Sequence, residues 1–164
     1  MMKPELITLV QAKDWLRSRL KEGEKCPCCN QHAKIYSRRL YSSMAASLVV
    51  LYKIASNGRW VHKRELVKHP TLGGTFGGGD FAKLSYWELI EENPKDDSED
   101  KRTSGWWRIT ETGKHFVEGS VSVKSHVHLY DGKVLGFEGY TMKIYEALGT
   151  KFSYEELRNG GIFI

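Results

Sequence analysis

The sequence lacks a long hydrophobic run, an internal repeat and a low-complexity tract. Its longest apolar stretch, Met44 to Tyr52, is interrupted by Ser47 and is far shorter than the roughly 20 residues that a membrane-spanning helix needs. The N-terminus also lacks the charged-then-apolar pattern of a secretory signal. We therefore expect a cytoplasmic protein that has no membrane partner.

Cysteine is scarce, and all three cysteines, Cys26, Cys28 and Cys29, lie within four residues. Such a cluster cannot join distant parts of a fold, which argues against a disulfide framework. In a cytosolic protein it indicates a metal site or free thiols. Cys26 and Cys29 form a C-P-x-C knuckle, in which the proline stiffens the turn and both sulfurs point to one side.

A structural zinc ion requires four ligands, and the knuckle supplies two of them. His126 and His128 stand at alternate positions of an expected strand, so their side chains point the same way. We predict a structural zinc site made of Cys26, Cys29, His126 and His128. The alternative is three reduced thiols beside an unrelated strand.

Sequence signatures of common enzymes are also missing. The chain has no H-E-x-x-H helix and no G-x-S-x-G turn. The glycine loop Gly73 to Gly79 leads into Asp80, where a phosphate-binding P-loop would have Lys-Ser/Thr, and a carboxylate would repel phosphate. We interpret this loop as a connector, and we expect a protein that is not an enzyme. A zinc enzyme using His126 and His128 is a remote alternative.

The segment that the chain does offer as a fold marker runs from Asp80 to Phe116. A short apolar helix with Phe81, Leu84 and Trp87 leads into a strand at Leu89 and Ile90. A polar tip and a second strand, Trp106 to Ile109, follow, and Thr110 can cap a last helix, Glu111 to Val117. This order is typical of the second half of a winged helix-turn-helix. In that fold the helix before the hairpin faces a nucleic-acid groove, and the tip of the hairpin is the wing.

The rest of the chain completes an α+β fold in three parts. Its 164 residues and hydrophobic content of 40% suffice for one main domain with an appendage. We predict a basic appendage at 1–41, made of a helix capped by Thr8 and the cysteine knuckle. A winged-helix domain at 42–120 follows, and at 121–164 a β-hairpin that turns at Asp131-Gly132 precedes short helices.

Positive charge is concentrated near the N-terminus. Residues 1–41 hold nine Lys and Arg against four Asp and Glu, a surplus of five that equals the net charge of the whole chain, +5. We predict that this region binds nucleic acid mainly through phosphate. The residues that we expect to contact it are Lys34, Arg38 and Arg39, with Lys83 and Tyr86 on the helix that faces the groove.

An alternative function is a protein-interaction module that docks on a host protein. Two features favour it. The wing carries four acids (Asp96, Asp97, Glu99 and Asp100) that would repel phosphate, and the chain ends on the apolar tail Ile162 to Ile164. The oligomeric state and the choice between DNA and RNA stay open.

Four segments resemble one group of uncharacterised phage and prophage proteins. They are the C-P-x-C knuckle followed by Lys-Ile-Tyr, LSYWELIEE (84–92), GWWRITETGKHFVEG (105–119) and KFSYEEL (151–157). The resemblance implies a phage context and no particular activity. At a wider level, Leu84 through Gly113 is similar to the winged-helix pattern of bacterial regulators, from which Glu88 departs, because regulators commonly have glycine there.

Overall fold

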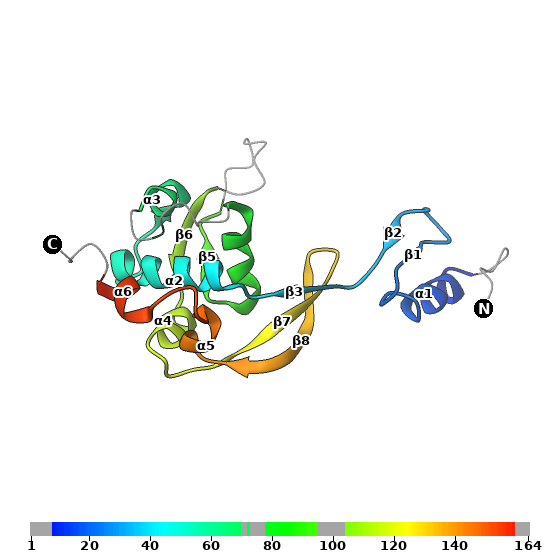
Figure 1. Cartoon of the computed structure of the whole chain (residues 1–164). Coiled ribbons are helices and arrows are strands. Elements are labelled where there is room, and N and C mark those ends of the chain that lie inside the picture. The colour runs from blue at the N-terminus through cyan, green and yellow to red at the C-terminus, as the bar shows by residue number, and fades with distance from the viewer. Residues whose placement is uncertain (1–7, 70–71, 73–77, 95–103, 160–164) are drawn as a thin grey trace. The chain divides into compact units, whose positions relative to one another are not determined.

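The structure, a computed structural model, describes residues 8–69, 72, 78–94 and 104–159 (Figure 1). It mixes helices and strands, as the α+β prediction requires. Two compact units make up the chain: unit 1 comprises residues 1–38 and 126–138, and unit 2 comprises residues 39–125 and 139–164. The predicted wing tip, the apolar tail and most of the glycine loop lie outside the described residues.

In unit 1 the first element is α1 (Leu9–Arg17), and its start confirms the predicted cap. The Thr8 hydroxyl accepts from the Gln11 amide at 3.2 Å, and the Gln11 side chain accepts from the Thr8 amide at 3.0 Å. Ala12 and Trp15 are buried, whereas Leu9 is 61% exposed. The strands β1 (Glu24–Lys25) and β2 (His32–Ala33) then pair antiparallel across the cysteine turn.

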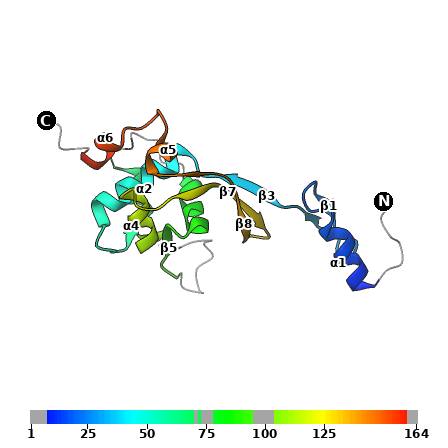
Figure 2. The same ribbon diagram turned by 90° about the horizontal axis from the view of Figure 1, so that it is seen from below.

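The core of unit 2 is α2 (Ser42–Ala55), in which every residue from Met44 to Leu51 is buried. A helix that is apolar on all sides must be covered on all sides. Accordingly α2 packs against α4 (Glu111–Val117), α5 (Ile144–Leu148) and α6 (Tyr154–Asn159), and these helices lie beside it in both views (Figures 1 and 2).

A three-stranded antiparallel sheet packs on the same helix. Its strands are β4 (Val61–His62), β6 (Trp106–Ile109) and β5 (Ile90–Glu92), in the order β4-β6-β5. The register places Val61 opposite Trp107 and Ile90 opposite Ile109. The helix α3 (Lys63–Val67) follows β4 directly, and its N-cap is His62, whose ring nitrogen accepts from the Arg64 amide.

The helix before β5 is a 3₁₀ helix, η2 (Gly78–Trp87), rather than an α-helix. The sequence explains this, because Phe81, Leu84 and Trp87 recur every third residue and a 3₁₀ helix has three residues per turn. All three side chains are buried. The Trp87 indole N–H also donates to the Lys124 carbonyl oxygen at 2.7 Å, which ties η2 to the start of β7 (Val123–Tyr130).

The turn from η2 into β5 is held by Thr110. Its hydroxyl donates to the Glu88 carbonyl oxygen at 2.5 Å and accepts from the Gly113 amide at 2.9 Å, capping α4 as predicted. Glu88 itself has a φ of 59°. The backbone there adopts the left-handed conformation that glycine enters most easily, although the residue is glutamate.

A second sheet has the order β3-β7-β8. The hairpin of β7 and β8 (Lys133–Met142) turns at Asp131 and Gly132, as predicted. The φ values of these two residues, 51° and 72°, are those of a type I′ turn. The first strand of this sheet, β3 (Tyr36–Arg39), follows β2 after two residues. The strand β8 continues to Met142, and the predicted short helices follow it, beginning with α5 at Ile144.

Among the described residues, no helix combines the length and the apolar character needed to cross a membrane.

Candidate functional site

Two cations and an aromatic ring meet in unit 1. Lys34 Nζ lies 5.9 Å from the centre of the Tyr36 ring, and Arg38 Cζ lies 5.4 Å from it. Tyr36 and Arg38 share one side of β3 because alternate residues of a strand point the same way. The Tyr36 side chain is 46% exposed. An exposed ring beside cations is the arrangement that proteins use to stack bases and to neutralise the phosphates next to them.

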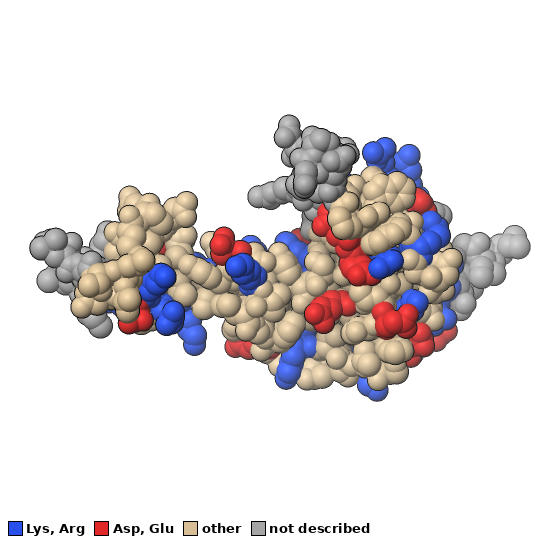
Figure 3. Space-filling view, turned by 180° about the vertical axis from the view of Figure 1, so that it is seen from behind, with Lys and Arg blue, Asp and Glu red and all other residues tan. Residues whose placement is uncertain are grey.

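Lys34, Tyr36 and Arg38 form a stripe on the surface of unit 1. No carboxylate of the described residues pairs with the positive charge of Lys34 or of Arg38. The ion pairs found there involve neither Lys34 nor Arg38. On the face drawn in Figure 3, Lys and Arg side chains lie along one edge of the N-terminal part of unit 1 with an acidic side chain beside them, whereas acidic and basic side chains alternate over unit 2. The stripe is therefore a positively charged surface open to an anionic partner.

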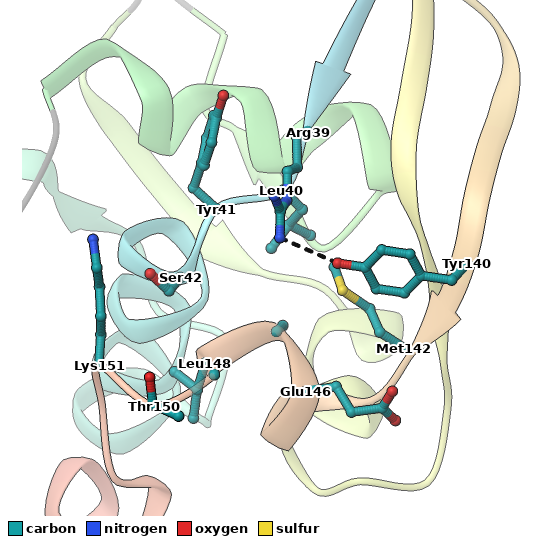
Figure 4. Close-up of a pocket in the computed structure, with 12 residues that line it drawn as sticks. Arg39, Leu40, Tyr41, Ser42, Tyr140, Met142, Glu146, Leu148, Thr150 and Lys151 are labelled. Atoms are coloured by element: carbon teal, nitrogen blue, oxygen red, sulfur yellow. Dashed lines mark hydrogen bonds between the residues drawn. The ribbon is translucent and has the colours of Figure 1, made fainter.

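Arg39 belongs to a different site, a hollow of about 300 Å³ in unit 2 where α2 begins (Figure 4). Its guanidinium donates to the Tyr140 hydroxyl at 3.2 Å. Lys151, Thr150 and Ser42 line the same hollow. Tyr41, the N-cap residue of α2, gives the helix no side-chain hydrogen bond. Cationic and hydroxyl groups thus line one hollow at the start of α2, where the positive end of the helix dipole also favours an anion.

One carboxylate, that of Glu146, also lines this hollow. Its oxygen accepts a hydrogen bond from the Lys143 amide at 3.4 Å, and Figure 4 shows it directed away from Ser42. The Glu146 carboxylate therefore caps the start of α5. Arg39 and Lys151 outnumber this one carboxylate, so the net charge of the residues that line the hollow is positive.

The residues predicted to face a groove carry less charge than expected. Lys83 Nζ lies 2.6 Å from the Asp80 carboxylate, one turn earlier on η2, so its charge is compensated locally. Tyr86 follows one turn later and is half-buried. The structure thus separates the five predicted contacts into the stripe, the hollow and a locally neutral helix.

The cysteine knuckle is closed by backbone hydrogen bonds. The Asn30 amide donates to the Cys26 carbonyl at 2.9 Å, and the Cys26 amide donates to the Gln31 carbonyl at 2.7 Å. The backbone N–H groups of Cys29 and Cys28 donate to the Cys26 sulfur and, with the Cys29 thiol, hold the pKa of Cys26 below its ordinary value. The turn thereby stabilises a thiolate, the form in which cysteine binds metals.

His126 and His128 alternate on β7 with the buried residues Ser125, Val127 and Leu129, which confirms that the two histidines share one side of the strand. The His128 ring pairs with the carboxylate of Glu138. Within the described residues, no group of three or more His, Cys, Asp or Glu is close enough to hold a metal ion. Cys26 and Cys29 therefore lie in one turn, and His126 and His128 lie on one side of β7. Among the described residues these two pairs do not form the predicted four-ligand zinc site.

Sequence reasoning missed Tyr36, Tyr140 and Lys151. The spacing of Lys34, Tyr36 and Arg38 at every second residue was a usable signal for the first, since such residues share one side of a strand. Tyr140 and Lys151 join Arg39 only through the tertiary fold, and no local pattern marks them.

Comparison of the chain with protein-family models, with curated proteins and with solved structures gives no match. The resemblance to phage proteins, drawn from the sequence, therefore stays a prediction.

Proposed function

We propose that this chain is a non-enzymatic nucleic-acid-binding protein whose main contact is the stripe of Lys34, Tyr36 and Arg38. The observation that carries the proposal is the exposed Tyr36 ring with Lys34 Nζ at 5.9 Å and Arg38 Cζ at 5.4 Å. Base stacking on an aromatic ring tolerates every sequence, and cations beside the ring follow the phosphate backbone. This chemistry favours a single strand as the ligand.

We further propose that unit 2 contains a winged helix. The element order α2, β4, α3, η2, β5, β6 and the sheet order β4-β6-β5 support it. In that fold the helix before the hairpin is offered to a groove. Here that helix is η2, whose Lys83 is neutralised by Asp80, so the winged helix contributes little electrostatic attraction. The affinity comes mainly from unit 1.

The hollow at Arg39 is proposed as a second phosphate contact. Arg39 and Lys151 supply positive charge and Ser42 and Thr150 supply hydroxyl donors, while Tyr140 orients the guanidinium. A guanidinium presents several N–H donors in one plane, which matches the oxygens of a phosphate group.

The proposal is tested by measuring the affinity of a labelled single-stranded oligonucleotide over a range of salt concentrations. Each phosphate contact on a single strand adds about 0.7 to the slope of log K against log salt. The double variant Lys34→Gln/Arg38→Gln should therefore lower the slope by about 1.4. The control Lys13→Gln/Lys143→Gln removes two exposed cations outside the stripe and should leave the slope close to that of the parent.

Binding that is independent of salt would contradict the proposal. An equal decrease of the salt slope in the stripe variant and the control variant would also contradict it. Binding would then depend on the net charge of the protein and not on the stripe.

A second candidate function, docking on a protein partner, is favoured by the edge strand β8. In the sheet order β3-β7-β8 this strand is terminal, and Val134, Leu135 and Phe137 are 41%, 56% and 47% exposed. An apolar edge strand can accept a strand of a partner. Leu135→Lys would then abolish the recovery of a stoichiometric protein in a nuclease-treated pull-down while nucleic-acid affinity stays unchanged.

A further inference from the structure

The cysteine turn of unit 1 presents two thiols, those of Cys26 and Cys29, to the same hollow. Cys26 and Cys29 come together at the end of the β1-β2 hairpin and line this hollow, and the Cys26 amide donates to the Gln31 carbonyl oxygen at 2.7 Å. Asn30 closes the turn with a φ of 63° and a hydrogen bond to the Cys26 carbonyl oxygen. These backbone hydrogen bonds fix the conformation of the turn. The two cysteines are therefore held near each other before any metal ion binds.

The described part of this chain does not complete the site. A structural zinc ion takes four ligands, and no described His, Cys, Asp or Glu joins Cys26 and Cys29 in a group of three. His32, the histidine nearest in sequence, lines the same hollow, but its ring packs on Gly23: a β carbon at Gly23 would lie 2.9 Å from its Nε2 atom. The ring of His128, predicted above as a ligand, is engaged by Glu138.

We propose that a zinc ion binds between two copies of this chain, each of which contributes Cys26 and Cys29. The turn is accessible for such a contact, since Cys29 is exposed and Cys26 is half-buried. Two identical pairs of thiolates related by a two-fold axis give the tetrahedral set of four sulfurs that zinc prefers. Binding converts thiols to thiolates and releases their protons to solvent.

The surroundings of the turn suit this centre electrostatically. Four thiolates around one Zn²⁺ carry a net charge of −2. Lys25 directly precedes Cys26, and Lys34 lines the same hollow as Cys26 and Cys29. In a pair of copies these cations are present twice, and they offset the charge of the centre.

The test is the titration of the reduced, metal-free full chain with zinc, followed by light scattering for the mass and by metal analysis for the stoichiometry. We expect one zinc per two chains and a doubling of mass that a chelator reverses. Cobalt in place of zinc should give the intense absorption of four thiolate ligands. Cys26→Ser and Cys29→Ser should each abolish both the zinc uptake and the dimer.

Cys28→Ser is the matched control, because it removes a thiol of the same turn and should leave zinc uptake and the dimer intact. Far-UV circular dichroism of each variant shows whether unit 2, which holds most of the helical residues, stays folded. One zinc per chain without a dimer would overturn the proposal in favour of a site within one chain. The absence of zinc uptake, or a zinc-dependent dimer that survives Cys26→Ser, would also overturn it.

Discussion

Gly113 lies directly against the carbonyl oxygen of Leu89: a β carbon built on Gly113 would stand 2.1 Å from that oxygen. The first turn of α4 therefore closes onto the chain just before β5 only because residue 113 has no side chain. Together with the two hydrogen bonds of the Thr110 hydroxyl, this contact fixes the junction of η2, β5 and α4.

Gly113→Ala should destabilise unit 2 severely. The backbone oxygen cannot move aside as a flexible side chain would, so we expect a loss of about 3 kcal/mol or more in the free energy of unfolding. Thermal and urea denaturation followed by circular dichroism measure it. Gly136→Ala is the control, since nothing lies within 4 Å of a β carbon there, and its melting temperature should match that of the parent.

Glu88→Gly should stabilise the protein. A left-handed backbone costs an L-residue about 1–2 kcal/mol, while glycine loses about 0.5–1 kcal/mol through its greater freedom in the unfolded chain. With Glu88 at a φ of 59°, we expect a net gain of about 0.5–1 kcal/mol in urea denaturation. Glu88→Ala removes the same carboxylate without relieving the backbone, and an equal gain in that variant would assign the effect to charge instead.

Thr110→Val should weaken the same junction from the other side. It removes the N-cap of α4 and leaves the Glu88 carbonyl without its donor. The expected loss is about 1–2 kcal/mol in the free energy of unfolding. Thr110→Ser keeps the hydroxyl and should stay within about 0.5 kcal/mol of the parent; a similar loss in both variants would show that the methyl group, not the hydrogen bonds, stabilises the turn.

Lys151→Gln should weaken binding to an oligonucleotide by removing one cation from the hollow at Arg39. One lost phosphate contact on a single strand lowers the salt slope by about 0.7. The comparison is Lys143→Gln, an exposed lysine nearby in sequence that does not line the hollow. If the two variants have the same slope, the hollow takes no part in binding.

Local sequence signals predicted some elements well. The bounds of β6 and α4 agree with the prediction residue by residue, because Thr110 ends one element and caps the next through bonds to its sequence neighbours. The turn at Asp131-Gly132 was equally local. The sequence predicted a short apolar helix before β5 without its type, and the spacing of Phe81, Leu84 and Trp87 by three residues suits the 3₁₀ helix η2.

The candidate sites were less predictable. The knuckle is a local motif, and Cys26 and Cys29 do lie together. That Asp80 would neutralise Lys83 depends on rotamers that a sequence does not specify. The grouping of Arg39 with Tyr140 and Lys151 depends on chain segments about a hundred residues apart, which only packing brings together.

The most direct test of the proposed function is the affinity of Tyr36→Ala and Tyr36→Phe for a single-stranded oligonucleotide at fixed salt. Stacking of one base on an aromatic ring contributes roughly 1–3 kcal/mol, so Tyr36→Ala should weaken binding about 5- to 150-fold. Tyr36→Phe keeps the ring and should bind like the parent. Unchanged affinity in Tyr36→Ala would contradict the account, because the stripe would then not be where the strand binds.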